Sequence, residues 1–173
     1  DLARNAAKHL PAGKRNRIGR GACTAEIPEC FQRQQRIARD KADLRAAQRL
    51  RYEVFVAELG GDGPLVDHEN RLERDEFDAD CDHLVLIDRR HDPAAMDHVV
   101  GVYRLLPGYR AAKLGRFYCD GEYDLSVLRD SGRKLLELGR SCVHPDHRGG
   151  AAMYLMWNAL ADYVIEQDIE ILF

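Results

Sequence analysis

The sequence has no long apolar run and no paired cysteine motif. No uninterrupted apolar stretch approaches the roughly 18 residues that a membrane-spanning helix needs, and no basic-then-apolar leader is visible. The five cysteines are odd in number, irregularly spaced and without a Cys-x-x-Cys pair, which argues against structural zinc. We therefore expect reduced thiols and a cytoplasmic protein.

The net charge of −3 is small and gives no overall reason to expect nucleic-acid binding. Its distribution is uneven, because the first twenty residues carry six Arg and Lys side chains against a single acidic residue, Asp1. This basic N-terminal arm, placed at residues 1–40, either makes peripheral contact with the anionic surface of the inner membrane or is a solvated tail.

The sign reverses between residues 67 and 82, where eight carboxylates face three basic side chains. Within this stretch, Glu73, Asp75 and Asp78 are spaced closely enough to bind Ca²⁺ or Mg²⁺, to engage a cationic substrate, or to form a solvated acidic loop. The stretch lacks the glycine and the terminal glutamate of an EF-hand loop.

At 173 residues the chain has the size of one domain, and its apolar periodicity predicts the elements. Helices are expected over residues 2–9, 41–58, 125–129 and 151–167, and strands over residues 83–87, 99–106, 134–143 and 169–173. Residues 107–123 are expected to be a loop. The order predicts an α/β fold with a mixed sheet. Because the sequence stops within an apolar, strand-like run, we expect the natural chain to continue.

Residues 143–150 join a predicted strand to a predicted helix. Amides at the start of that helix, with Arg148, Gly149 and Gly150, could hold a phosphate, although an ordinary strand-to-helix turn has the same pattern. His144 and His147 supply two metal ligands without a convincing third, so no metal is expected.

Four further side chains are candidates for chemistry. Two are on the strand before this loop, and two are on the predicted helix over residues 41–58. Glu137, between two leucines, is a candidate general base, and Arg140 is either its partner in the site or part of a surface pair. On a regular strand their three-residue spacing would point them to opposite faces. Arg51 could hold a substrate carboxylate bidentately or pair with the acidic loop, and Phe55 fits a core position.

Four segments together resemble a known family. They are residues 48–55, 73–78, 103–106 and 137–143, within a resemblance that runs from Leu44 to Phe173. They resemble GNAT-related N-acyltransferases that use acyl carrier protein, and most closely the L-ornithine Nα-acyltransferases that make lyso-ornithine lipid. The same skeleton is similar to that of the acyl-homoserine-lactone synthases.

The resemblance implies a GNAT-like, mostly antiparallel mixed sheet flanked by helices over residues 41–173, incomplete at its C-terminus. It implies transfer of a 3-hydroxyacyl chain from acyl carrier protein to the α-amine of L-ornithine. Glu137 and Arg140 would be catalytic. The implied acceptor site is Arg51, Phe55, Glu73, Asp75, Asp78 and Arg104, and the implied acyl-donor site is Ser141, Cys142, Val143, His144, Arg148, Gly149 and Gly150.

The residues after Arg148 depart from the general GNAT loop, which favours a carrier-protein donor over coenzyme A. No resident cofactor is expected, because the phosphopantetheine thioester is a co-substrate. An acidic carrier protein could dock on a basic surface near Lys113, Arg116, Arg133 and Lys134. Three alternatives remain open: a glutamine acceptor, acyl-homoserine-lactone synthesis from S-adenosylmethionine, and a non-enzymatic acyl-carrier-binding module.

Overall fold

The computed structural model describes residues 33–173. Its strands are β1 (Arg33–Ile37), β2 (Asp82–Asp88), β3 (Val99–Pro107), β4 (Leu135–Val143) and β5 (Ile171–Leu172). Its helices are α2 (Lys41–Arg51), the π-helix η1 (Tyr52–Glu58), α3 (Gly108–Leu114), α4 (Ser126–Asp130) and α5 (Gly150–Glu166), with 3₁₀ turns at Pro93–Ala95, Tyr118–Gly121 and Pro145–His147. Across this part of the chain, no helix has the length and apolar character to cross a bilayer.

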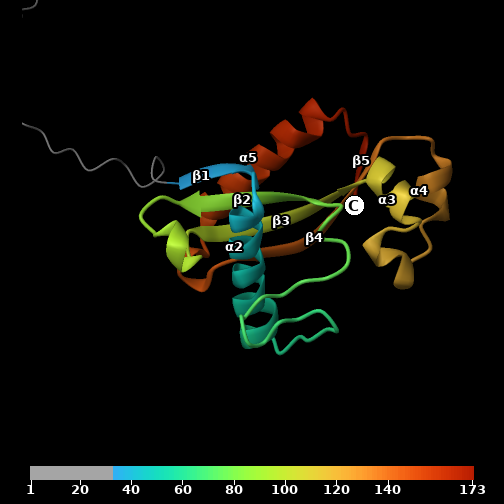
Figure 1. The fold of residues 1–173 in the computed structure, drawn as a ribbon. Helices are drawn as coiled ribbons and strands as arrows, with labels where there is room; N and C mark the ends of the chain where they lie inside the picture. The colour runs from blue at the N-terminus through green and yellow to red at the C-terminus, as the bar shows by residue number, and fades with distance from the viewer. Residues whose placement is uncertain (1–32) are drawn as a thin grey trace, which may run out of the picture.

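The five strands form one sheet in the order β1-β2-β3-β4-β5. The first four strands pair antiparallel with their neighbours, and β5 pairs parallel to β4. Figure 1 shows this twisted sheet with the helices around it. The predicted α/β class and the mostly antiparallel mixed sheet are therefore confirmed.

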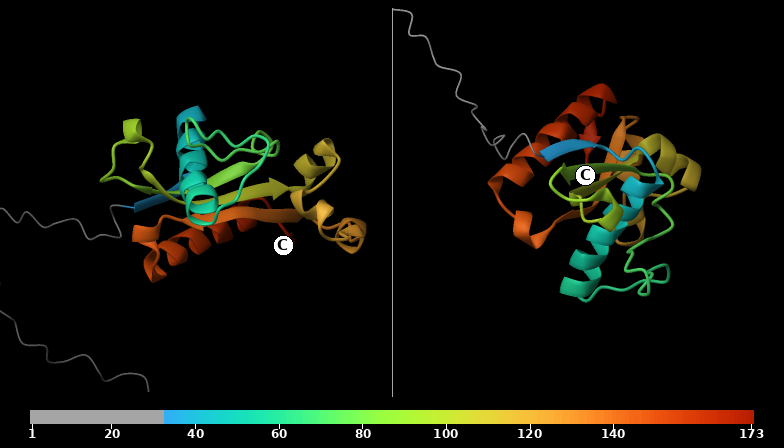
Figure 2. Two further views of the ribbon diagram at one scale, coloured as in Figure 1. Left: turned by 90° about the horizontal axis from the view of Figure 1, so that it is seen from below. Right: turned by 60° about the vertical axis from the view of Figure 1, so that its left-hand side comes forward.

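Helices cover both faces of the sheet, with α2 on one side and α5 on the other (Figure 2). The α2 face is filled by small side chains, including Ala46 and Ala47 against Val85 and Val102. The α5 face is filled by larger ones, with Met156 at its centre. Along β2, Leu84 and Leu86 serve the α5 face and Val85 and Ile87 serve the α2 face, as the two-residue period of a strand requires.

The predicted helix over residues 41–58 is present, but its last two turns widen into the π-helix η1. It begins where the Asp40 side chain accepts the backbone N–H groups of Ala42 and Asp43, a normal N-cap. Asp43 in turn forms an ion pair with Arg36 of β1. This contact ties the edge strand to the start of α2.

The structure differs from the sequence expectations at β1 and at residues 107–123. The sheet begins before residue 41, because β1 pairs along its whole length with β2. The expected loop at residues 107–123 is wrong, since it contains α3 and a 3₁₀ turn. The predicted helix over residues 2–9 lies outside the described residues.

A bulge interrupts β4 beside its partner β3. Gly139 pairs with Arg104, whereas Cys142 pairs with Val102, so two residues of β4 face the single residue Tyr103. Arg140, the first of the two, has φ of +48°, in the left-handed region that non-glycine residues seldom adopt. The bulge breaks the alternation of side chains along β4 in the middle of the strand.

Candidate functional site

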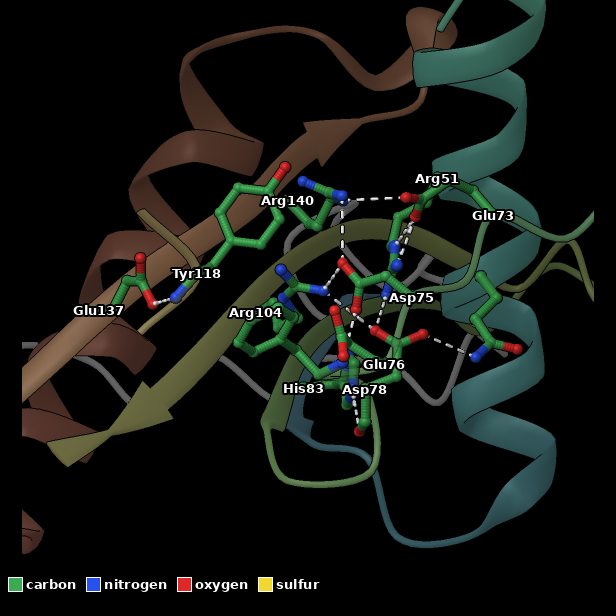
Figure 3. Close-up of polar contacts among 12 residues, drawn as sticks. Arg51, Glu73, Asp75, Glu76, Asp78, His83, Arg104, Tyr118, Glu137 and Arg140 are labelled. Atoms are coloured by element: carbon green, nitrogen blue, oxygen red, sulfur yellow. Dashed lines mark hydrogen bonds and ion pairs between the residues drawn. The ribbon is translucent and has the colours of Figure 1, made fainter. Parts of the chain in front are cut away.

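A network of three arginines and three carboxylates lies on the α2 side of the sheet (Figure 3). The arginines come from α2, β3 and β4, and the carboxylates come from the acidic stretch before β2; they are Arg51, Arg104, Arg140, Glu73, Asp75 and Asp78. All six were predicted site residues, and the fold brings all six together. Their formal charges cancel within the network.

Arg51 is at the buried end of this network. Its guanidinium is fully buried and pairs with Glu73 and with Asp78, the latter at 2.7 Å. Gln48, one turn earlier on α2, donates to Asp78 at 2.9 Å. Burial favours the neutral form of Asp78, but the Arg51 charge and the hydrogen bonds from Arg51 and Gln48 together outweigh it and lower the pKa of that carboxyl. This end of the network therefore holds the acidic stretch onto α2.

Arg104 and Arg140 are at the other end of the network and share Asp75. Arg104 pairs with Asp75 at 2.5 Å, and Arg140 Nη2 lies 3.1 Å from the same carboxylate. Arg140 also donates to Glu73 at 2.9 Å. The ring of Tyr118 lies between the two guanidiniums, with its centroid 5.2 Å from Arg104 and 4.7 Å from Arg140.

Glu137 is buried, and both of its oxygens accept backbone N–H groups. Oε2 accepts from Tyr118 and Oε1 accepts from Cys119, each at 2.8 Å. Figure 3 shows Glu137 and Arg140 on either side of Tyr118. The expectation that they point to opposite faces holds only for a regular strand, and the bulge at Arg140 removes that regularity.

A cavity of about 740 Å³ opens beside this network. Four of the predicted site residues line it, namely Phe55, Glu73, Asp75 and Arg140. Arg51 and Arg104 do not line it but pair with the lining carboxylates Glu73 and Asp75. Asp78 does not line it either and pairs with both of these arginines. Phe55 was expected in the core but is only half-buried and forms part of the cavity wall. We call this space the acidic cavity, since its lining carries four carboxylates and three arginines.

A second cavity, of about 760 Å³, lies beyond the segment that carries Tyr118. Arg116 lines both cavities, Phe117 lines the second and Tyr118 lines the first. We call residues 116–118 the partition. Three predicted carrier-docking residues, Arg116, Arg133 and Lys134, line the second cavity together with Arg129; Lys113 lies on the adjacent helix α3.

The predicted donor loop follows β4. The Arg148 guanidinium donates to the Val143 carbonyl at 3.1 Å and pairs with Glu58 of η1 at 2.5 Å. His144 caps the 3₁₀ turn that follows it, and Gly149 is the N-cap position of α5. The loop therefore has the strand–turn–helix form that the sequence predicted, with Arg148 held by a carboxylate.

The side chains of Ser141 and Cys142 point in different directions. Ser141 is exposed, whereas Cys142 packs under α2 in the small-residue core. Burial raises the pKa of the Cys142 thiol to about 12, so it stays protonated at neutral pH. A buried, protonated thiol argues against a covalent intermediate at Cys142.

Sequence reasoning missed Tyr118, Gln48 and Glu58. Tyr118 lay in the stretch expected to be a loop, and nothing in its neighbourhood predicts contact with two arginines. Gln48 was detectable, since it lies three residues before Arg51 and hence on the same face of a helix. Glu58 gave no signal, because its partner Arg148 is 90 residues away.

The sequence matches a known protein family. Residues 50–158, well over half of the chain, match the acetyltransferase (GNAT) domain. The chain belongs to the GNAT acetyltransferase domain family.

Curated proteins similar to this chain are more specific than the domain family. The chain is 70% identical over 138 residues to a protein of Rhodobacter capsulatus, covering 80% of this chain and 53% of that protein. It is 36% identical over 140 residues to a protein of Brucella abortus, covering 80% of this chain and 50% of that protein. Both relatives are named L-ornithine Nα-acyltransferase. The chain spans about half the length of these relatives.

Two solved structures share the fold. The N-acyl amino acid synthase FeeM from uncultured soil microbes matches with a TM-score of 0.56 and 16% identity, over 81% of this chain and 68% of that one. The acyl-homoserine-lactone synthase LasI matches with a TM-score of 0.56 and 21% identity, over 81% of this chain and 70% of that one.

Proposed function

We propose that this chain is the GNAT-like part of an L-ornithine Nα-acyltransferase, which moves a 3-hydroxyacyl chain from acyl carrier protein to the α-amine of ornithine. The names of the curated relatives support the reaction. The observation that carries the proposal is Arg140 beside Asp75, 3.1 Å apart, on the wall of the acidic cavity. A free amino acid carries both a carboxylate and an ammonium group, so its binding site needs a cation and an anion close together.

The acceptor occupies the acidic cavity in this account. Arg140 holds its α-carboxylate, because a guanidinium presents paired donors to a carboxylate. Asp75 and the exposed Glu76 hold its side-chain ammonium. The lining carries one more carboxylate than arginine, which complements the net positive charge of ornithine better than neutral glutamine.

Glu137 accepts the amine proton through one water in this account. Its two oxygens each accept one backbone N–H, and a carboxylate oxygen has room for a second hydrogen bond. A small cavity of about 10 Å³, about the volume that one water needs, is lined by Glu137, Tyr118 and Gly139, among others. That water would carry the proton from the attacking amine to Glu137.

The donor thioester lies along β4 near the bulge. His144 donates its backbone N–H to Val100 of β3, so in an antiparallel ladder Val143 directs its backbone groups away from β3. The hydrogen bond from Arg148 to the Val143 carbonyl agrees with this orientation. The Val143 N–H therefore faces the same side, where it could stabilise the tetrahedral oxyanion, and the donor phosphate would meet Arg148 and the start of α5.

Because the donor phosphate is attached to the carrier protein, a carrier whose phosphate meets Arg148 docks at that end of β4, and its acyl chain runs from there towards the partition. The basic residues Lys113, Arg116, Arg133 and Lys134 lie at the other end of β4, around the second cavity, and are the alternative docking surface for the acidic carrier. Peripheral contact of residues 1–40 with an anionic membrane remains part of the proposal, since the product is a lipid.

Mass spectrometry of lipids from a host that expresses the full-length protein tests this function. A new lipid of the mass of 3-hydroxyacyl-ornithine supports the proposal. A 3-hydroxyacyl-glutamine, a released homoserine lactone or the absence of any new lipid would each support one of the alternatives instead.

A further inference from the structure

Three potential metal ligands converge at the end of β2 that lies away from the charged network. Asp88 ends β2, His91 lies in the turn after it, and His147 lies in the 3₁₀ turn before α5. Their ligand atoms all lie within 4.8 Å of one another. The convergence joins two segments that are 56 residues apart, which is why the sequence alone gave His147 no convincing partners.

The two members at the centre of the cluster are shielded from solvent. The Asp88 side chain is 0% exposed and the His147 side chain is 8% exposed, and His147 Nδ1 lies 3.9 Å from Asp88 Oδ2. The imidazole of His144, which is outside the cluster, lies beside His147 with 5.7 Å between the ring centroids. The cluster thus offers a carboxylate and two imidazoles, with a third imidazole adjacent.

His91 is oriented by a carboxylate of its own. Its Nδ1 lies 3.2 Å from Asp97 Oδ2, a contact in which an Nδ1–H would donate to the carboxylate and Nε2 would be left to bind a metal. A histidine that binds a metal through one ring nitrogen commonly donates a hydrogen bond from its other ring N–H to a carboxylate. Asp97 therefore has the position of a residue that fixes the tautomer of a ligand.

Positive charge already fills this cluster. Arg90 pairs with Asp88 at 2.5 Å, and Arg33 Nη2 lies 3.4 Å from His147 Nδ1. The Arg90 guanidinium contacts both Asp88 oxygens and its side chain is 45% exposed, so a metal that binds Asp88 must displace it towards solvent.

We propose that Asp88, His91 and His147 form a binding site for a divalent transition metal, with zinc the best match. Two imidazoles and a carboxylate are a familiar zinc donor set, and a water or His144 would complete a tetrahedron. The metal displaces Arg90 from Asp88 and links the β2–β3 turn to the turn before α5. Asp88, His91 and His147 are not among the residues assigned to acyl transfer, although His147 directly precedes Arg148 of the donor loop.

The test is titration of the full-length protein with Zn²⁺ alone by calorimetry, and with Co²⁺ as a spectroscopic probe of tetrahedral nitrogen and oxygen ligands. The chelator-treated protein should bind one ion at this site. His147→Ala and His91→Ala should each weaken that binding at least about tenfold, and Asp97→Asn about 10- to 100-fold. His68→Ala, an exposed histidine paired with Asp62, should bind as the parent does.

A further variant separates a built site from adventitious binding. Arg90→Ala removes the competing cation, so Zn²⁺ should bind more tightly and should raise the melting temperature more than in the parent. Circular dichroism confirms that each variant is folded, and Asp97→Asn leaves all three ligands in place. The proposal is overturned if the parent binds no ion, if both histidine variants bind as the parent does, or if Arg90→Ala does not bind more tightly.

Discussion

Glu137 fixes the position of Tyr118, because its Oε2 accepts the Tyr118 backbone N–H at 2.8 Å. The Tyr118 ring is in turn the surface on which the Arg140 guanidinium stacks, 4.7 Å from the ring centroid. The proposed base therefore also holds the partition between the two cavities. Its two roles need separate measurements.

Glu137→Gln should lower kcat by about 10²- to 10⁴-fold, the usual contribution of a general base. The loss should be in kcat and not in KM for ornithine, whereas a displaced Tyr118 would also disturb Arg140 and raise that KM. Glu69→Gln, at an exposed carboxylate outside the cavity lining, is the matched control and should keep the parent kcat and KM. Acyl transfer by Glu137→Gln within a few-fold of the parent would exclude Glu137 as the base.

Arg51→Met should destabilise the fold by about 3–5 kcal/mol, because it leaves buried Glu73 and Asp78 without their shared partner. Urea unfolding followed by circular dichroism measures the change. Arg71→Met breaks an exposed pair with Glu53 and should leave the stability close to that of the parent. Equal losses for the two variants would contradict a structural role for Arg51.

Asp75→Asn should reduce discrimination between ornithine and glutamine. The acceptor ammonium loses its charged partner, so KM for ornithine should rise about tenfold or more, while KM for glutamine changes less. Competition between the two amino acids, read by mass spectrometry of the products, gives the ratio directly. An unchanged ratio would place the ammonium elsewhere in the cavity.

Glu58→Gln should strengthen donor binding, because Glu58 occupies the Arg148 guanidinium that we assign to the donor phosphate. KM for the acyl carrier protein thioester should fall in this variant and rise in Arg148→Ala, with KM for ornithine unchanged in both. If neither substitution changes the donor KM, Arg148 does not contact the donor.

The fold should lose stability in acid partly through Asp43. The hydrogen bond from Arg36 holds the pKa of Asp43 below its usual range. A carboxyl with a lowered folded-state pKa stabilises the protein fully above its unfolded pKa of about 3.9, and that stabilisation is lost as the pH falls through the lower folded value. Urea unfolding between neutral pH and pH ~3 should show this loss, and Asp43→Asn should show a shallower dependence.

Regular elements with a strong apolar period could be predicted from the sequence. The helix over residues 41–58 and the hairpin of β2 and β3 were predicted because their apolar side chains repeat at the spacing of the element. Strand β1 was harder, since four of its five residues are polar and backbone pairing with β2 holds it. Helix α3 is short and begins at a glycine, and its stability comes from packing of Ala111 in a tertiary cluster.

The sequence predicted which charged residues come together, but not how they are arranged. The resemblance gave the six charged residues of the network, yet only burial shows that Arg51 lies behind the cavity while Arg140 lies on its wall. The contacts of Glu137 with Tyr118 depend on a tertiary fold and on a bulge in β4. No local pattern specifies either of them.

The most direct test of the central claim is a purified reaction with the full-length protein, 3-hydroxyacyl carrier protein and ornithine. We predict free carrier thiol and Nα-(3-hydroxyacyl)-ornithine in equal amounts, with ornithine preferred over glutamine and S-adenosylmethionine. Thioester that stays intact in the presence of ornithine, or an acyl chain that transfers only to another acceptor, would contradict the account.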